Sequence, residues 1–220
     1  TEAAGVALAP HGKTTMAPQL WARQLAAGAW GITLATPWQV QLARSFGVGR
    51  IMLANAMTDP NGLHWLATEL TDDPSFEFVS WVDSVDTVAL MDRHLGRAPG
   101  GVRVRVVVEL GGPGGRTGAR SVEAALAVAA AVDGSARLEL AGIGGYEGAF
   151  AHDRSPAGLD AVHRYLDEIA RLHAEVGGGT ASKPGIVTAG GSAYPDLVVE
   201  HLAGLADDRT TVVLRSGAYV

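Results

Sequence analysis

The sequence contains no cysteine, no long apolar run and no excess of basic residues. Without cysteine, the chain can form no disulfide, no thiolate metal site and no cysteine nucleophile. No apolar run reaches the roughly 18 to 20 residues that a membrane span requires, and no signal peptide is recognisable. The net charge of -6 provides no basic surface for nucleic acid. The composition therefore predicts a soluble, cytoplasmic protein that binds neither membranes nor nucleic acid.

The apolar residues that are present suffice for a large core. Hydrophobic residues make up 47% of the 220 residues and charged residues 18%, which is typical of a folded chain. This length suits a single α/β barrel, and two small domains are the alternative. The sequence begins at Thr1 rather than Met and ends at Val220, with no helix to cover the last apolar segment. We therefore expect it to be part of a longer chain.

Apolar, β-rich segments alternate with helical segments along the whole sequence. Most strand candidates are continuous apolar runs, as in parallel strands that are covered on both faces. They comprise residues 6–9, 31–35, 50–54, 76–82, 102–110, 137–143, 185–189 and 211–214. Eight such units predict a (β/α)8 TIM barrel, and a doubly wound open sheet is the alternative. Helix starts are expected at capping side chains and helix ends at glycines, namely Thr36, Asp59, Ser84, Ser121, Ser155, Gly96, Gly134 and Gly177.

The segment LAPHGKTTM at residues 8–16 holds the most informative side chain, Lys13. It follows the first strand candidate and precedes the opening of a helix, so it lies at a carboxyl strand end. Desolvation of a lysine is costly unless the ammonium is paired or loses its proton, so a buried Lys13 could have a depressed pKa. A neutral amine can form a Schiff base with an aldehyde. The alternative is an ordinary surface lysine in the first loop.

Short glycine-containing turns follow the seventh and eighth strand candidates. They are residues 188–192 (TAGGS) and 216–218 (SGA), in the place where TIM barrels commonly bind phosphate. Glycine allows backbone N–H groups to approach an anion, and Ser192 can add a hydroxyl donor. Plain tight turns are the alternative. The glycine-rich run at residues 111–118 lacks the Gly-Lys-Ser/Thr ending of a phosphate loop, so we reject that interpretation.

Arg116 and Tyr146 follow the fifth and sixth strand candidates. Arg116 can act as a fixed cation that donates to an anionic oxygen, and a solvated loop arginine is the alternative. Tyr146 lies among glycines that leave room for a flat ligand, and an ordinary core tyrosine is the alternative. At the same barrel mouth we expect Lys13, Arg215 and the two glycine turns. An amine, a phosphate site, an aromatic ring and two arginines are the parts that a pyridoxal 5'-phosphate (PLP) site needs.

The motif PHGKTT at residues 10–15 resembles the Schiff-base lysine motif of the fold-type III PLP enzymes. Within these alanine racemase-like barrels it is most similar to the D-threonine aldolase and D-serine dehydratase (deaminase) branch. The resemblance covers the whole chain, and its next most specific parts are residues 142–148 and 214–220. It implies a cofactor-bearing Lys13, an Arg116 that contacts the phenolic oxygen and a Tyr146 that packs on the pyridine ring, all three catalytic. It further implies an Arg215 that faces the pyridine nitrogen, and phosphate or other cofactor contacts from His11, Gly191, Ser192, Gly217 and Ala218.

The resemblance implies a PLP-dependent lyase that deaminates a β-hydroxy D-amino acid such as D-serine or D-threonine. Thr15 stands where the branch usually has histidine, and Arg215 is more typical of racemases. Retro-aldol cleavage and racemisation are therefore alternatives. So are a PLP-binding protein without turnover and a barrel enzyme for phosphorylated sugars that uses Lys13 without PLP.

The family also implies parts that these residues do not contain. Its barrel carries a separate C-terminal β domain, which can supply ligands for a divalent metal, and its members form homodimers. Within residues 1–220 we expect no metal site, because the seven histidines include no pair at zincin spacing. We interpret His152 and Asp153 as a solvated loop.

Overall fold

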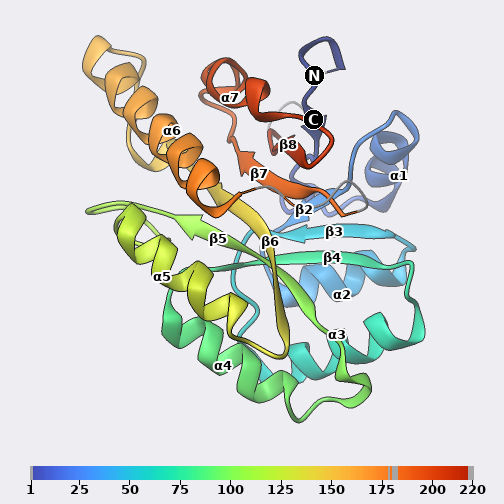
Figure 1. Ribbon diagram of the computed structural model, residues 1–220. Coiled ribbons are helices and arrows are strands. Elements are labelled where there is room, and N and C mark those ends of the chain that lie inside the picture. Colours follow the sequence, from blue (N-terminus) through green and yellow to red (C-terminus); the bar gives the residue numbers. More distant parts are fainter. Residues whose placement is uncertain (1, 178, 180–182, 218–220) are drawn as a thin grey trace.

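The structure is a computed structural model that describes residues 2–177, 179 and 183–217, and strands alternate with helices throughout it (Figure 1). The strands are β1 (Ala7–Leu8), β2 (Ile32–Leu34), β3 (Arg50–Leu53), β4 (Glu77–Val82), β5 (Val104–Leu110), β6 (Leu138–Gly145), β7 (Gly185–Ala189) and β8 (Thr210–Leu214). The α-helices are α1 (Pro18–Ala26), α2 (Pro37–Ser45), α3 (Pro60–Asp72), α4 (Val85–Leu95), α5 (Val122–Asp133), α6 (Pro156–Val176) and α7 (Pro195–Leu202). Short 3-10 helices span Glu2–Ala4, Pro99–Gly101, Glu147–Ala149 and Ala203–Leu205.

All eight strands belong to one parallel sheet in the order β1-β8-β7-β6-β5-β4-β3-β2. Sequence neighbours are therefore sheet neighbours, and the first strand pairs with the last. A doubly wound sheet would instead reverse its strand order at a switch point. The predicted eight parallel strands are confirmed, and the doubly wound alternative is wrong.

The sheet curls but does not close as a continuous ladder, so the expected (β/α)8 barrel is present only in part. In the described residues, β1 and β2 are linked by an isolated bridge between His11 and Thr33. Backbone hydrogen bonds also run from the Trp30 amide to the Leu8 carbonyl (2.7 Å) and from the Thr33 amide to the Pro10 carbonyl (2.9 Å). Because β1 has only two residues and Pro10 has no amide hydrogen, a regular ladder cannot continue here.

The helix boundaries follow the capping residues. Each of the five predicted caps accepts a hydrogen bond from the backbone N–H three residues ahead, at Thr36, Asp59, Ser84, Ser121 and Ser155. The predicted C-terminal glycines, Gly96, Gly134 and Gly177, each follow the last helical residue. Local side-chain chemistry therefore determines where these helices begin and end. None of the helices in the described ranges is long and apolar enough to span a bilayer.

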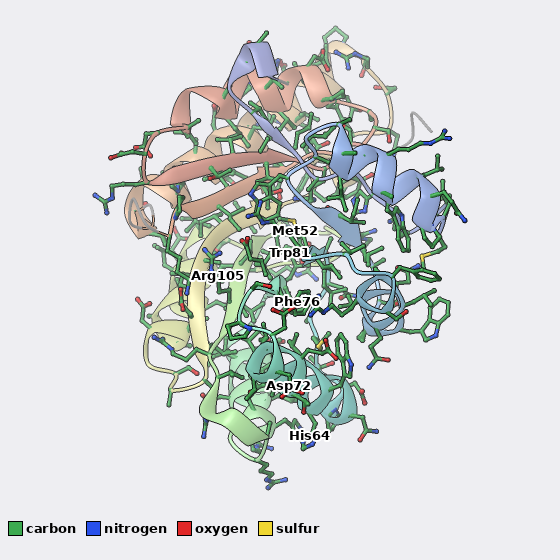
Figure 2. All side chains as sticks on the ribbon, turned by 90° about the vertical axis from the view of Figure 1, so that its right-hand side faces the viewer. Met52, His64, Asp72, Phe76, Trp81 and Arg105 are labelled. Atoms are coloured by element: carbon green, nitrogen blue, oxygen red, sulfur yellow. The ribbon has the colours of Figure 1, made fainter. Side chains whose placement is uncertain are left out.

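The core has two layers. The larger cluster fills the space between the sheet and the helices that lie outside its curl, and it contains Phe76 (Figures 1 and 2). The smaller cluster lies inside the curl and contains Met52 and Trp81, with Ala9, Val79, Val107, Ala141, Ile186 and Val213. The inner cluster fills the curl below the carboxyl ends of the strands, which leaves room for a cavity at that end.

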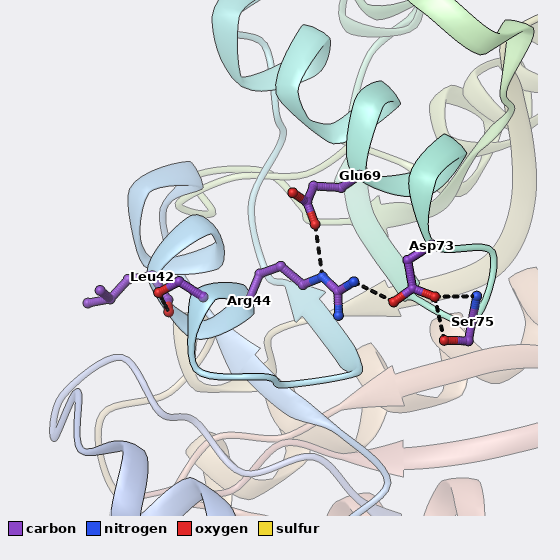
Figure 3. A network of polar contacts seen from close by, with 6 residues as sticks. Leu42, Arg44, Glu69, Asp73 and Ser75 are labelled. Atoms are coloured by element: carbon purple, nitrogen blue, oxygen red, sulfur yellow. Dashed lines mark hydrogen bonds and ion pairs between the residues drawn. The ribbon is translucent and has the colours of Figure 1, made fainter.

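An ion-pair network holds α2 against α3 (Figure 3). The Arg44 guanidinium on α2 donates from Nε to Glu69 (3.0 Å) and from Nη2 to Asp73, which caps the end of α3. It also lies 4.4 Å from the ring centroid of Phe76, which belongs to the outer core. Both helices are thus connected to the start of β4.

Candidate active site

A cavity of about 560 Å³ opens at the carboxyl ends of the strands. It is lined by every predicted site residue that the structure describes, namely His11, Lys13, Arg116, Tyr146, Gly191, Ser192, Arg215 and Gly217. Ala218 lies outside the described residues. The other lining residues are Thr14, Ala35, Ala54, Asn55, Trp81, Glu109 and Thr117. The expected convergence on one mouth is therefore present, and the roles of the residues stay predictions.

The loop after β1 carries Lys13 to the rim of this cavity. The Gly12 amide donates to the Thr33 carbonyl (2.8 Å), and the Gln39 side chain donates to the Lys13 carbonyl (3.2 Å). A Cβ on Gly12 would lie 2.4 Å from Trp21 Nε1, so only glycine allows α1 to pack this closely. Lys13 itself is exposed, and the burial considered for it is wrong. The reason is that the chain turns away from the sheet directly after its last bond to β2.

The two glycine turns after β7 and β8 are linked to each other and to a buried carboxylate. Glu147 is fully buried, and its two oxygens accept hydrogen bonds from the amides of Gly190 and Gly191, both at 2.9 Å. The Ser216 hydroxyl donates to the Gly191 carbonyl (2.9 Å). Both glycine amides therefore donate to a protein carboxylate, and the phosphate contact expected of Gly191 stays a prediction. Ser192 and Gly217 still line the cavity and keep their proposed role.

Arg215 lies at the floor of the cavity. Its guanidinium donates to the Thr188 hydroxyl (2.8 Å) and to the Gly145 carbonyl (2.6 Å), and lies 4.9 Å from the Trp81 ring centroid. Its Nε is buried and has no hydrogen-bond partner in the described residues. Burial lowers the pKa of this guanidinium, and the charge of Glu147 opposes that shift. The side chain is therefore a fixed cation with an unused donor.

Tyr146 is positioned by Tyr165 and faces Arg116. The Tyr146 amide donates to the Tyr165 hydroxyl (3.0 Å), which donates in turn to the Leu110 carbonyl (2.6 Å). The Arg116 guanidinium lies 5.2 Å from the Tyr146 ring centroid. A Cβ on Gly191 would lie 2.6 Å from this ring, so the ring packs directly on the turn after β7. The aromatic ring therefore connects the β5, β6 and β7 sides of the cavity.

The electrostatic field of the cavity is positive. Burial, together with the charges of Arg215, Lys13 and Arg116, lowers the pKa of His11 from 6.5 to about 3. His11 is therefore a neutral imidazole near pH 7, and its buried Nδ1 has no hydrogen-bond partner in the described residues. Burial also raises the pKa of Glu109, although Thr117 donates to its carboxylate at 2.7 Å. Three cations at one mouth favour an anionic ligand.

The fold is shared with solved structures. No protein-family model and no curated protein sequence matches the chain. D-threonine aldolase from Filomicrobium marinum matches with a TM-score of 0.78 at 22% identity, over 99% of this chain and 56% of that chain. D-threo-3-hydroxyaspartate dehydratase from Delftia sp. HT23 matches with a TM-score of 0.68 at 24% identity, over 98% of this chain and 54% of that chain. Alanine racemase from Oenococcus oeni matches with a TM-score of 0.68 at 13% identity, over 96% of this chain and 57% of that chain.

The chain has the alanine racemase-like fold. It spans a little over half the length of each of these structures. At these identities the likeness concerns the fold, and the chemistry has to be argued from the residues in the cavity.

The residues at the cavity fit PLP, the cofactor that the sequence motif implies. The volume lies within the range of small-molecule sites. The positive field suits a phosphate, and the unpartnered Arg215 Nε and His11 Nδ1 are buried polar atoms that a bound ligand could satisfy. The exposed amine of Lys13 is accessible from the mouth. These are the features that a phosphorylated aldehyde requires.

Two carboxylates of the site, Glu109 and Glu147, were not predicted from the sequence. Glu109 is the second-last residue of the apolar strand β5 and lines the cavity. Glu147 directly follows Tyr146. A charged residue at the carboxyl end of a buried strand was the available signal for both. The partners of Glu147 are more than 40 residues away in the sequence, so its role could not be derived from local spacing.

Proposed function

We propose that this chain forms the PLP-binding part of a lyase for β-hydroxy D-amino acids, with deamination of D-serine or D-threonine as the preferred reaction. One observation carries the proposal: Lys13, the two arginines Arg116 and Arg215, and the two linked glycine turns surround a single cavity. The substrates named for two structures of this fold, D-threonine and D-threo-3-hydroxyaspartate, both carry a hydroxyl on Cβ. The proposed substrate class follows from that shared chemistry.

PLP supplies an electron sink that stabilises negative charge developing at Cα of a bound amino acid. The chain's own residues then have separable tasks. Lys13 provides the amine that holds the cofactor, and Ser192 and Gly217 bind its phosphate together with the positive field. Arg116 contacts the phenolic oxygen and Tyr146 fixes the plane of the pyridine ring. Arg215, whose charge is held in place by Thr188 and the Gly145 carbonyl, opposes protonation of the pyridine nitrogen.

For deamination, the Lys13 amine would take the Cα proton and the β-hydroxyl would leave as water. The released enamine would become an imine, and a water molecule would hydrolyse it to a keto acid and ammonia. Glu109 places a further carboxyl on the cavity wall, and burial raises its pKa. Retro-aldol cleavage is the second candidate, and the match to a D-threonine aldolase favours it. In that case the hydroxyl loses its proton and the Cα–Cβ bond breaks, giving glycine and an aldehyde. The fixed charge of Arg215 favours racemisation as a third candidate.

Cofactor attachment can be tested because the sequence has only two lysines, Lys13 and Lys183. Lys183 pairs with Glu139 at the opposite, amino end of the strands, which makes it a matched control. The protein is incubated with PLP, reduced with borohydride and mapped by peptide mass spectrometry. We expect the pyridoxyl label on Lys13, its loss in Lys13→Arg and its retention in Lys183→Arg. Label at Lys183 alone, or at neither lysine, would contradict the proposal.

The reaction is tested with the longest natural chain that contains this sequence, incubated with D-serine and with D-threonine. Ammonia with a keto acid identifies deamination, and glycine with an aldehyde identifies retro-aldol cleavage. Loss of the optical rotation of D-serine without either product identifies racemisation, as does conversion of D-threonine to L-allo-threonine. Labelled Lys13 with none of these activities would favour a PLP-binding protein without turnover. Unlabelled protein that turns over phosphorylated sugars would favour a barrel enzyme that does not use PLP.

Four further features belong to the same proposal. The barrel closes between β1 and β2, the protein assembles as a homodimer, it acts in the cytoplasm, and any divalent metal needed for the reaction is supplied by a C-terminal domain. Light scattering of the natural chain tests the dimer, and metal analysis of the same sample tests the metal.

A further inference from the structure

A second cluster of polar side chains lies between α6 and α7, which are neighbouring helices (Figure 1). His163 and Asp167 come from α6, and Glu200 and His201 from α7. None of the four lines the cavity described above. His163 Nδ1 and His201 Nε2 face each other at 2.6 Å, and their ring centroids are 4.9 Å apart. Two imidazoles from different helices thus direct a nitrogen to the same point.

Asp167 determines which nitrogen of His201 can bind a ligand. Its carboxylate lies 2.9 Å from His201 Nδ1. An ionised carboxylate can only accept hydrogen bonds, so Nδ1 carries the proton and Nε2 presents its lone pair to His163. Carboxylates orient metal-binding histidines in this way, by accepting from the ring nitrogen that does not bind the ion. The side chain of His201 is therefore arranged as a metal ligand would be.

We propose that His163, Glu200 and His201 bind a divalent transition-metal ion, with Zn²⁺ as the best fit. Their ligand atoms all lie within 4.8 Å of one another. Two imidazoles and one carboxylate form a ligand set of zinc sites that keep one open position, whereas Mg²⁺ and Ca²⁺ prefer oxygen ligands. At Zn–N distances of about 2.0–2.1 Å, tetrahedral ligand nitrogens lie about 3.3 Å apart. Binding thus requires the two rings to separate by less than about 1 Å, which a small side-chain rotation provides.

The charge of the cluster supports a cation. Asp167 and Glu200 contribute two carboxylates, and in the part of the chain that the structure describes neither forms an ion pair with lysine or arginine. With neutral imidazoles, the cluster has a surplus of negative charge that a dication would neutralise. The competing interpretation is a direct N–H···N hydrogen bond between the histidines, which would hold α6 to α7 without an ion.

Zinc titration of tag-free protein by isothermal titration calorimetry distinguishes these interpretations. We expect one Zn²⁺ per chain and loss of that binding in His163→Ala and in His201→Ala. Asp167→Asn, which removes only the orienting carboxylate, should weaken binding about 10- to 100-fold. Two histidines outside the cluster, the exposed His64 and His152, provide matched controls whose alanine variants should bind as the wild type does.

Absence of zinc binding by the folded wild type would overturn the proposal. So would unchanged binding in the two cluster histidine variants, because the ion would then bind elsewhere. If these variants fail to fold, Glu200→Gln is the second test, since Glu200 is exposed and both imidazoles remain. Its affinity should fall, and Co²⁺ bound to the wild type should give the intense visible absorption of a tetrahedral site. A wild-type affinity in Glu200→Gln, or a Co²⁺ spectrum of an octahedral site, would contradict the assignment.

Discussion

The hydroxyl of Ser216 donates a hydrogen bond of 2.9 Å to the carbonyl oxygen of Gly191. This bond joins the turn after β8 to the turn after β7, and the Arg215 amide adds a second link to the Ala189 carbonyl (3.3 Å). The spacing between the turns is thus determined by protein contacts and needs no ligand. An anion that enters between Ser192 and Gly217 would meet a preorganised site, which lowers the ordering cost of binding.

Removing the link between the turns should weaken cofactor binding. A buried hydroxyl-to-carbonyl bond contributes about 0.5–1.5 kcal/mol, so Ser216→Ala should reduce the affinity for PLP about 3- to 10-fold. Titration of PLP, followed by absorbance, measures the effect. Ser45→Ala is a matched control, because the Ser45 hydroxyl also donates to a backbone carbonyl but does so on α2, away from the cavity. Equal affinities for both variants would show that the link does not organise the site.

Replacing the buried carboxylate should destabilise the whole β7 side of the cavity. Glutamine at position 147 has one acceptor oxygen, so Glu147→Gln leaves one of the two glycine amides facing an NH₂ group. A buried donor without an acceptor costs about 1–3 kcal/mol, and we expect a loss of that size in the free energy of unfolding. Urea denaturation measures it. Glu168→Gln, at an exposed position on α6, should leave the unfolding midpoint unchanged.

Features of this fold that depend on neighbouring residues could be predicted from the sequence. A helix cap accepts a hydrogen bond from the amide three residues ahead, as at Thr36, Asp59 and Ser155, so the signal and its effect lie in the same segment. The strand candidates were also local, since most were continuous apolar runs. The order of the strands in the sheet was not determined by these runs, and the doubly wound sheet stayed an alternative until the pairing of β1 with β8 was observed.

Features that depend on distant residues could not be predicted in this way. Glu147 receives its hydrogen bonds from residues 43 and 44 positions away, and His163 meets a histidine 38 positions away. The exposure of Lys13 and the open edge between β1 and β2 follow from how the first loop bends, which spacing does not encode. The residues that line the cavity were nevertheless foreseeable, because parallel strands bring all their carboxyl ends to one rim.

His11 should remain neutral across the physiological pH range. Its pKa is lowered from 6.5 to about 3 by burial and by Arg215, Lys13 and Arg116. Between these two values the unfolded imidazole binds a proton that the folded one does not, so acidification from 6.5 toward 3 destabilises the folded state. His11→Gln should reduce this pH dependence of the unfolding free energy. NMR titration of the imidazole carbons, assigned with the same variant, should show no His11 midpoint between pH 5 and 8.

An anion in the cavity should shift that titration. Inorganic phosphate bound among the three cations offsets the charges that hold a proton off His11, so its pKa should rise toward the ordinary value. The comparison is a titration with and without phosphate at constant ionic strength, with perchlorate as the matched salt. A His11 midpoint near 6.5 without phosphate would contradict both the burial of this ring and the effect of the three cations on it.

The network between α2 and α3 should make stability depend on acid pH (Figure 3). Hydrogen bonds from Ser75 and from Arg44 lower the pKa of Asp73 to about 2. A depressed carboxyl pKa stabilises the fold above the unfolded value of 3.8, and this contribution is lost as the pH falls toward 2. Asp73→Asn should therefore lower the Tm at neutral pH, and the difference from wild type should vanish in acid.

The control for this prediction is Asp72→Asn, which removes an exposed neighbouring charge at the end of the same helix. Its Tm should follow that of the wild type at every pH, because the described hydrogen bonds of the network involve Asp73 and not Asp72. If both variants lose the same amount of stability, the effect is one of net charge. A constant Tm difference between wild type and Asp73→Asn from neutral pH down to pH 2 would also contradict the assignment, because a titrating ion pair cannot give a pH-independent contribution.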